Sequence, residues 1–168
     1  MAETREILLD WLRDAYAMEQ MSIEILEKQA RRLESYPQMR QRVQQHTDES
    51  RTHADQLKSL IKQMGDDTSS VKSGLGSMMG NFGAIFNAST PDEVVKNSIG
   101  DFAVENFEIA SYRALIGAAK ELGETNVQHV CEQILQQEEA MASFLQQNLP
   151  MITQEFLQRQ QAGAPAKR

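Results

Sequence analysis

Five glutamates of the 168-residue chain interrupt patterns of apolar residues that repeat at helical spacing: Glu19, Glu49, Glu105, Glu108 and Glu138. A carboxylate buried without a partner is costly, so it is expected to shift its pKa, pair with a cation or bind a metal. One such residue would be typical of a helix edge that reaches solvent. A carboxylate in each of four helical patterns instead indicates a shared site.

Each of these glutamates lies near the middle of a long helical pattern. Helices of similar length that pack side by side would bring all five to one level of a bundle. Several carboxylates at one level would repel one another strongly, and hard or borderline cations would remove that repulsion. The pattern therefore predicts a carboxylate-rich metal site, with iron or manganese as the metal.

A weak internal repeat assigns roles within this site. Glu19 and Glu49 are 30 residues apart, as are Glu108 and Glu138, and the second pair follows the first by 89 residues. We therefore expect Glu19 and Glu108 to be terminal ligands, and Glu49 and Glu138 to be bridging ligands. Glu105, one turn before Glu108, is a further oxygen ligand in this interpretation.

Two histidines are spaced to join the glutamates. Bundles that bind two iron or manganese ions use one Glu from each of two helices and Glu-x-x-His from the other two. Here His53 follows Glu49 by four residues instead of three, and Ala142 occupies the equivalent position in the second half. We expect His53 to be a ligand and His46 to lie behind the ligands or to relay protons. The alternative for both is a hydrogen-bonded core histidine.

Four long amphipathic patterns are expected to form the helices that position these residues, at about residues 3–33, 38–64, 90–123 and 125–147. The third is expected to begin with a capping box of Thr90 and Glu93, with Pro91 at the first helical position. Its predicted buried stripe includes Ile99, and Gly123 is placed to end it.

The connections between these patterns predict the topology. Short turns join the first to the second helix and the third to the fourth, so each pair forms an antiparallel hairpin. About 26 residues, Gly65 to Thr90, separate the pairs and interleave glycines with large apolar side chains. We expect a long crossover that makes helices two and three parallel; a plain up-down bundle with a floppy loop is the alternative.

The predicted fold is thus an all-α, ferritin-like four-helix bundle over residues 1–161, with a short C-terminal helix after Pro150 and a disordered tail at 162–168. The net charge of −7 argues against nucleic acid or an anionic membrane surface as a partner. A single cysteine, Cys131, and the absence of a signal-like or membrane-spanning run favour a cytoplasmic location.

Several segments together resemble the ferritin-like stress proteins of the YciE and YciF type: DWLRDAYAMEQ, HTDESRTH, VENFEIASYRALIGAAKELG and ILQQEEAMASFL. The early DWLRDA run and the NLPMITQEFL segment are more similar to the YciE branch. The resemblance covers about residues 5–160 and implies a ferritin-like bundle, a homodimer and a di-metal centre. The acidic positions that recur in the family fall on the five glutamates named above, whereas Ala142 stands near a position that is often acidic in relatives.

Two functions are compatible with these features. The first is a di-iron or di-manganese protein that oxidises iron or consumes O₂ or peroxide, with an external electron donor because the chain has no Cys-x-x-Cys pair. The second is a non-enzymatic stress-response dimer in which the metal site is structural or vestigial. Iron storage in a ferritin-type shell is a third, weaker alternative.

Overall fold

The computed structural model describes residues 2–66 and 90–166, and within them it contains helices and no strands. The four long helices are α1 (Ala2–Arg32), α2 (Pro37–Gln63), α4 (Glu93–Leu122) and α5 (Thr125–Gln161). The prediction of an all-α chain is therefore confirmed. Among the described residues, no helix is both long and apolar enough to cross a lipid bilayer.

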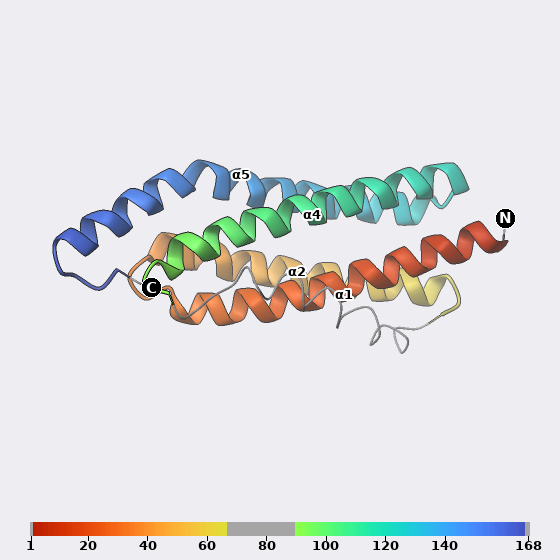
Figure 1. Cartoon of the computed structure of the whole chain (residues 1–168). Helices are drawn as coiled ribbons and strands as arrows, with labels where there is room; N and C mark the ends of the chain where they lie inside the picture. Colours follow the sequence, from red (N-terminus) through yellow and green to blue (C-terminus); the bar gives the residue numbers. More distant parts are fainter. Residues whose placement is uncertain (1, 67–89, 167–168) are drawn as a thin grey trace.

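The helices form a four-helix bundle made of two antiparallel hairpins, α1–α2 and α4–α5 (Figure 1). The hairpins meet where α1 packs on α4 and α2 on α5. α2 and α4 run in the same direction, so the end of α2 and the start of α4 lie at opposite ends of the bundle (Figure 1). This is the predicted single-crossover, ferritin-like topology. The predicted crossover segment itself falls on residues 67–89, outside the described residues.

The apolar core has two parts with a polar layer between them. One part includes Leu8, Leu12, Leu57, Leu115 and Ile134. The other includes Leu26, Val43, Val94, Met141 and Leu145. Burying each such side chain contributes about 1.5–3 kcal/mol, so the two apolar parts can stabilise a bundle whose middle layer is polar.

Glycines follow two of the helices, and Gly123 does so where the sequence predicts. Gly65 and Gly123 follow α2 and α4 and have φ angles of 92° and 70°. In this left-handed region a glycine avoids the clash that a Cβ would make with the backbone.

We expect Gly123→Ala to destabilise the protein by about 1–2 kcal/mol, the cost of placing an ordinary residue in the left-handed conformation. Gly117→Ala is the matched control, because Gly117 lies inside α4 and its added Cβ would meet nothing within 4 Å. That control should instead stabilise by about 0.5–1 kcal/mol. Urea unfolding midpoints measure both changes, and equal midpoints for the two variants would contradict the expectation.

The N-terminal cap and the buried side chains at the start of α4 differ from those expected from the sequence. The N-cap residue is Asp92 and makes no side-chain capping hydrogen bond, so the predicted Thr90–Glu93 capping box is wrong. The carboxylate of Glu93 is instead paired with the Arg32 guanidinium at the end of α1, with Nη2 2.7 Å from Oε2. In addition Ile99 is 50% exposed, whereas Asp101 is buried.

α5 also differs from its prediction, because it continues through Pro150 to Gln161 as one helix. Proline lacks a backbone N–H and removes one helical hydrogen bond, which bends a helix more readily than it ends one when the next turn is packed. That next turn buries Ile152, and α5 curves over its blue C-terminal part (Figure 1). Beyond it, in the segment predicted to be a disordered tail, the Ala166 carbonyl accepts a 2.6 Å hydrogen bond from Tyr36 Oη.

Candidate metal centre

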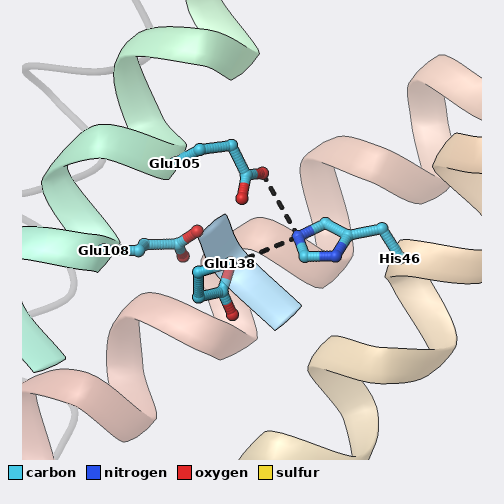
Figure 2. Close-up of side chains that lie close together, drawn as sticks. All are labelled: His46, Glu105, Glu108 and Glu138. Carbon is cyan, nitrogen blue, oxygen red and sulfur yellow. Dashed lines mark ion pairs between the residues drawn. The ribbon is translucent and has the colours of Figure 1, made fainter. Parts of the chain in front are cut away.

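Six ionisable side chains from all four helices converge in the polar layer between the two apolar parts. They are Glu19 of α1, His46 and His53 of α2, Glu105 and Glu108 of α4, and Glu138 of α5. Each is at most 2% exposed. Figure 2 shows four of them, with the side chains of α2, α4 and α5 pointing toward one another.

The first group of ligand atoms surrounds His46. Its Nε2 lies 3.2 Å from Glu105 Oε1 and 3.4 Å from Glu138 Oε2, as Figure 2 marks. One oxygen of Glu108 completes the group, and the four ligand atoms lie within 4.8 Å of one another. A single ion could therefore contact one imidazole and three carboxylates.

The second group surrounds His53. Its Nδ1 lies 3.0 Å from Glu138 Oε1 and 3.4 Å from Glu19 Oε1. Glu138 thus belongs to both groups and presents a different oxygen to each histidine. This is the arrangement expected of a carboxylate that bridges two ions.

The residues fit metal ions because their inward-facing atoms lack other partners. The buried atoms without a hydrogen bond include Glu19 Oε2, His46 Nε2, His53 Nδ1, Glu105 Oε2 and both carboxylate oxygens of Glu138. The histidine–carboxylate contacts therefore have ion-pair distances but not hydrogen-bond geometry. Buried polar atoms normally have a hydrogen-bond partner, so a concentration of ligand atoms without one is what a site that could hold an ion would show.

Hydrogen bonds with surrounding side chains hold three of the ligands. Tyr112 Oη donates to Glu19, and Ser22 Oγ donates to Glu108 Oε1 at 2.6 Å. His53 Nε2 lies 2.5 Å from the amide oxygen Oε1 of Gln137. Such contacts fix the orientation of metal ligands, and at Glu19 the oxygen that accepts from Tyr112 is also the one that faces His53.

Burial dominates the acid–base properties of three glutamates. It raises the pKa of Glu105 to about 8, and the nearby Glu138 carboxylate adds to the effect. The pKa of Glu108 is raised well above its ordinary value by burial and by the surrounding carboxylates, and that of Glu19 is raised mainly by burial. The Glu105 carboxyl group consequently retains its proton near neutral pH when no cation is present.

For the two histidines, the neighbouring carboxylates outweigh burial and set the direction of the pKa shift. Burial alone lowers the pKa of His53, but the facing carboxylates of Glu138 and Glu19 raise it to about 10. The pKa of His46 is raised well above its usual value by Glu105 and other carboxylates, against the same effect of burial. Burial raises the pKa of Glu138, but the two imidazoles have the larger effect in the opposite direction. The net pKa of Glu138 is therefore below its ordinary value. Protons thus balance much of the charge when no metal is bound.

Glu49, predicted as a bridging ligand, lies outside both groups, and His46 lies inside. The Glu49 side chain is 16% exposed, and its Oε2 is 2.9 Å from His46 Nδ1, the ring nitrogen that does not face the cluster. Arg42 and Gln45 donate to the same carboxylate at 3.1 and 2.8 Å. These partners lower the pKa of Glu49 to about 2 although burial raises it. In this arrangement Glu49 orients His46.

The helical phase explains this exchange of roles. At about 100° per residue, Glu49 is rotated about 120° from the buried Val43. Ser50, which is buried and lies only about 20° from Val43, occupies the centre of the inner face instead. His46 and His53 are seven residues apart and flank it. Residues seven apart share one helix face, and this is the signal that identifies both histidines.

We expect Glu49→Gln to weaken metal binding by about 10–100-fold without changing the number of ions bound, as is usual for a residue that orients a ligand. Asp48→Asn is the control, since Asp48 is an exposed neighbour that pairs with Arg51. Competition with a chromophoric chelator gives the affinities. Loss of one or both ions in Glu49→Gln would show that Glu49 is a direct ligand, as the sequence predicts.

Fold and site together define the class: an all-α, ferritin-like bundle whose core contains a buried cluster of glutamates and histidines that could hold metal. The chain belongs to the family described as domain of unknown function DUF892, whose model matches residues 3–158.

Solved structures have the same fold over nearly the whole chain. A protein of Xanthomonas campestris pv. campestris is 34% identical, with a TM-score of 0.80 over 94% of this chain and 99% of that one. YcfI of Rhodopseudomonas palustris is 24% identical, with a TM-score of 0.68 over 85% of this chain and 92% of that one. The stress protein YciF of E. coli is 18% identical, with a TM-score of 0.71 over 89% and 96%. These likenesses show a shared fold and do not identify a closest member of the family.

Proposed function

We propose that this chain is a metalloprotein whose bundle core binds two divalent metal ions bridged by Glu138. The observation that carries the proposal is the set of buried, unpaired ligand atoms arranged in two groups that share Glu138. His46, Glu105 and Glu108 would complete one ion's ligands, and His53 and Glu19 those of the other. Two divalent ions would replace the protons that otherwise balance the carboxylates.

Iron or manganese is the metal that this ligand set favours. Carboxylates with a minority of imidazoles, and no thiolate in either group, suit these ions better than softer ones. A pair of iron or manganese ions can exchange electrons with an oxidant such as O₂ or peroxide. The chain's own residues would hold the ligands in place through Tyr112, Ser22 and Gln137, and would exclude bulk water through the apolar parts on both sides.

Metal analysis of the purified protein tests the proposal. After anaerobic reconstitution with Fe²⁺ or with Mn²⁺, about two ions per chain should remain after desalting. No uptake of either ion would overturn the proposal. Rapid oxidation of the bound iron by peroxide, with repeated turnover when an external reductant is supplied, would extend the function to an enzyme.

A non-enzymatic stress-response protein is the second candidate function. It is favoured by the ion-pair distances between the two histidines and the carboxylates, which allow protons to hold the cluster without metal. A metal-loaded protein that does not react with peroxide and gains only thermal stability would support this alternative. The association with stress comes from the E. coli protein YciF, whose likeness to this chain is one of fold.

We further expect a homodimer, as the family resemblance implies. Large apolar side chains exposed on the described surface include Ile99 and Phe107 on α4, and Met151 and Leu157 on α5. Such side chains mark a partner surface where they form one contiguous patch, as a dimer interface would require. Light scattering coupled to size-exclusion chromatography gives the mass, and a value corresponding to one chain would contradict this expectation.

A further inference from the structure

A seam of polar contacts between α1 and α4 connects the cluster to one end of the bundle. Three hydrogen-bonded pairs cross the seam at successive levels: Ser22 to Glu108 at 2.6 Å, Gln29 to Asp101 at 2.9 Å and Arg32 to Glu93 at 2.7 Å. All three acidic partners are buried. Polar pairs at three consecutive levels are unusual inside a helix–helix contact, where apolar side chains normally meet.

The α4 side of this polar seam is a continuous row. Its members are Glu93, Asn97, Asp101, Glu105 and Glu108, separated by four, four, four and three residues. This spacing places them along one face of the helix. The row therefore runs from the bundle end directly to two ligands of the cluster.

In the opposite direction from the cluster, the same two helices meet through apolar residues. Leu12, Ala15, Leu115 and Ala119 all belong to the apolar part at that end. The polar row is therefore not a general property of the α1–α4 contact. It is confined to the half between the cluster and the start of α4, which lies at the same end of the bundle as the end of α1 (Figure 1).

A small cavity lies at the outer end of the polar seam. It has a volume of about 10 Å³ and is lined by Asn97, Ser98 and Asp101 of α4, Gln29 and Arg32 of α1, and their neighbours. That volume is close to the space that one water molecule needs. Asn97 Oδ1 is buried without a hydrogen-bond partner. The Arg32 side chain, 32% exposed and paired with Glu93, forms the wall that reaches solvent.

We propose that the polar seam is the path by which divalent cations pass between solvent and the cluster, with Asp101 as the last carboxylate before Glu105. The inference rests on the proposed function, because it supplies the route that the proposed ions would need. The ligands are at most 2% exposed, so an ion cannot reach them from solvent directly. Asp101 lies one turn before Glu105, about 6 Å along the axis. Carboxylate and amide oxygens are the groups that hard cations prefer.

The Arg32–Glu93 pair acts as the outer gate of this path. The guanidinium repels an arriving cation and also occupies the Glu93 carboxylate, which would otherwise attract one. Swinging Arg32 into solvent exposes that carboxylate and the cavity behind it. A competing path runs past Glu49, whose side chain is 16% exposed and contacts His46. The two paths differ in the residues that should control the rate.

Stopped-flow uptake of Co²⁺ at pH 8, followed by its visible absorbance, distinguishes the paths, and release is measured by adding EDTA. We expect Asp101→Asn, which preserves the shape of the side chain, to slow both uptake and release by about tenfold or more. Stoichiometry and Kd should change little, because Asp101 is not a ligand. Arg32→Ala should change the rate in the opposite direction, with uptake about threefold faster or more. Asp92→Asn is the control, an exposed carboxylate at the same end of α4 that pairs with Lys96.

Unchanged Co²⁺ rates in both Asp101→Asn and Arg32→Ala would overturn the proposed path while leaving the metal centre intact. Slow uptake in Glu49→Gln together with normal rates in Asp101→Asn would assign the path to the Glu49 side and would also overturn it. A wild-type protein that binds no Co²⁺, Fe²⁺ or Mn²⁺ at equilibrium would remove the proposed function itself, and this inference with it.

Discussion

Glu138→Gln is expected to abolish the binding of both metal ions, which is the largest effect of any single substitution in the chain. Glu138 is fully buried, and its two oxygens face His53 at 3.0 Å and His46 at 3.4 Å. Glutamine keeps the side-chain volume but loses the charge and replaces one oxygen by a hydrogen-bond donor. Both groups lose a shared ligand, so affinity should fall by more than about 100-fold, beyond the usual effect of an outer contact.

The neighbouring Glu139→Gln is the matched control. Glu139 is exposed and pairs with Arg113 on the surface, so its loss should leave about two ions per chain. In the metal-free Glu138→Gln protein, the pKa of His46 and of His53 should fall, because the carboxylate that stabilises their charged forms is gone. Proton NMR titration of the two imidazoles measures this change. Retention of two tightly bound ions in Glu138→Gln would rule out the bridging role.

The level of the site could be predicted from the sequence because helix geometry fixes it. A glutamate in the middle of each long amphipathic pattern must lie near the middle of the bundle, whatever the details of packing. The structure accordingly brings Glu19, Glu105, Glu108 and Glu138 into one cluster, together with His53. Whether these residues bind metal stays a prediction, since their convergence is also compatible with protons alone.

Which side of the helix faces inward was harder to predict on α2. An apolar pattern defines the inner face only to within one residue position, about 100°. Both Glu49 and Ser50 are compatible with the inner face that Val43 and Leu57 define. Glu49 is the one selected when the inner residue is expected to be a carboxylate ligand. The structure places Ser50 inside, which turns Glu49 toward Arg42 and brings His46 into the cluster. Local spacing could not decide between them because the choice depends on how α2 rotates against the other helices.

On α4 the apolar pattern predicted the wrong position at Ile99, while its neighbours in the stripe, Val95 and Phe102, pack against the core as expected. Ile99 belongs to the expected stripe but is 50% exposed, and the polar Ser98 and Asp101 are buried instead. Hydrophobic burial normally makes the apolar face the inner one. Here the contacts of Gln29 with Asp101 and of Arg32 with Glu93 offset the cost of burying the carboxylates. Those partners come from α1, about 60 to 70 residues earlier, so no window around Ile99 contains the information.

The departures on α2 and α4 have a common physical cause. Each occurs where a helix turns polar side chains inward, and a polar side chain can be buried only when its partner is supplied from elsewhere. The apolar ends of the bundle need no such partner, and there the prediction from local pattern succeeded, including the end of α4 at Gly123. Functional layers are therefore the part of a bundle that the sequence alone specifies least directly.

Metal binding is expected to strengthen steeply with pH, by about 100-fold per pH unit if two protons leave as the ions bind. The two protons come from the carboxyl of Glu105, with a pKa of about 8, and from His53, with a pKa of about 10. Each must be deprotonated to bind a cation. The dependence should weaken as pH rises through about 8, where Glu105 loses its proton without metal, and end above about 10.

The stability of the metal-free protein should have the opposite dependence. For Glu105 the pKa is about 8 folded against 4.5 unfolded, so the folded state holds more protons in this window and loses stability as pH rises through it. The stabilisation from protonated His53 is complete below pH 6.5 and is lost as pH rises through about 10. Glu49 acts in the other direction, and its contribution is lost only as pH falls from 4.5 through about 2. The metal-free Tm should therefore be highest at mildly acidic pH.

Thermal unfolding with Mn²⁺ and with EDTA, at intervals from pH 5.5 to pH 8.5, checks both dependences in one experiment. The Tm in EDTA should fall as pH rises, and the difference between the Mn²⁺ and EDTA curves should widen, because tighter binding to the folded state adds stability. In Glu138→Gln that difference should be absent at every pH, whereas Glu139→Gln should match the wild type. A Mn²⁺ effect that is constant across this range would mean that binding releases no protons. The ion would then lie away from the buried carboxyls.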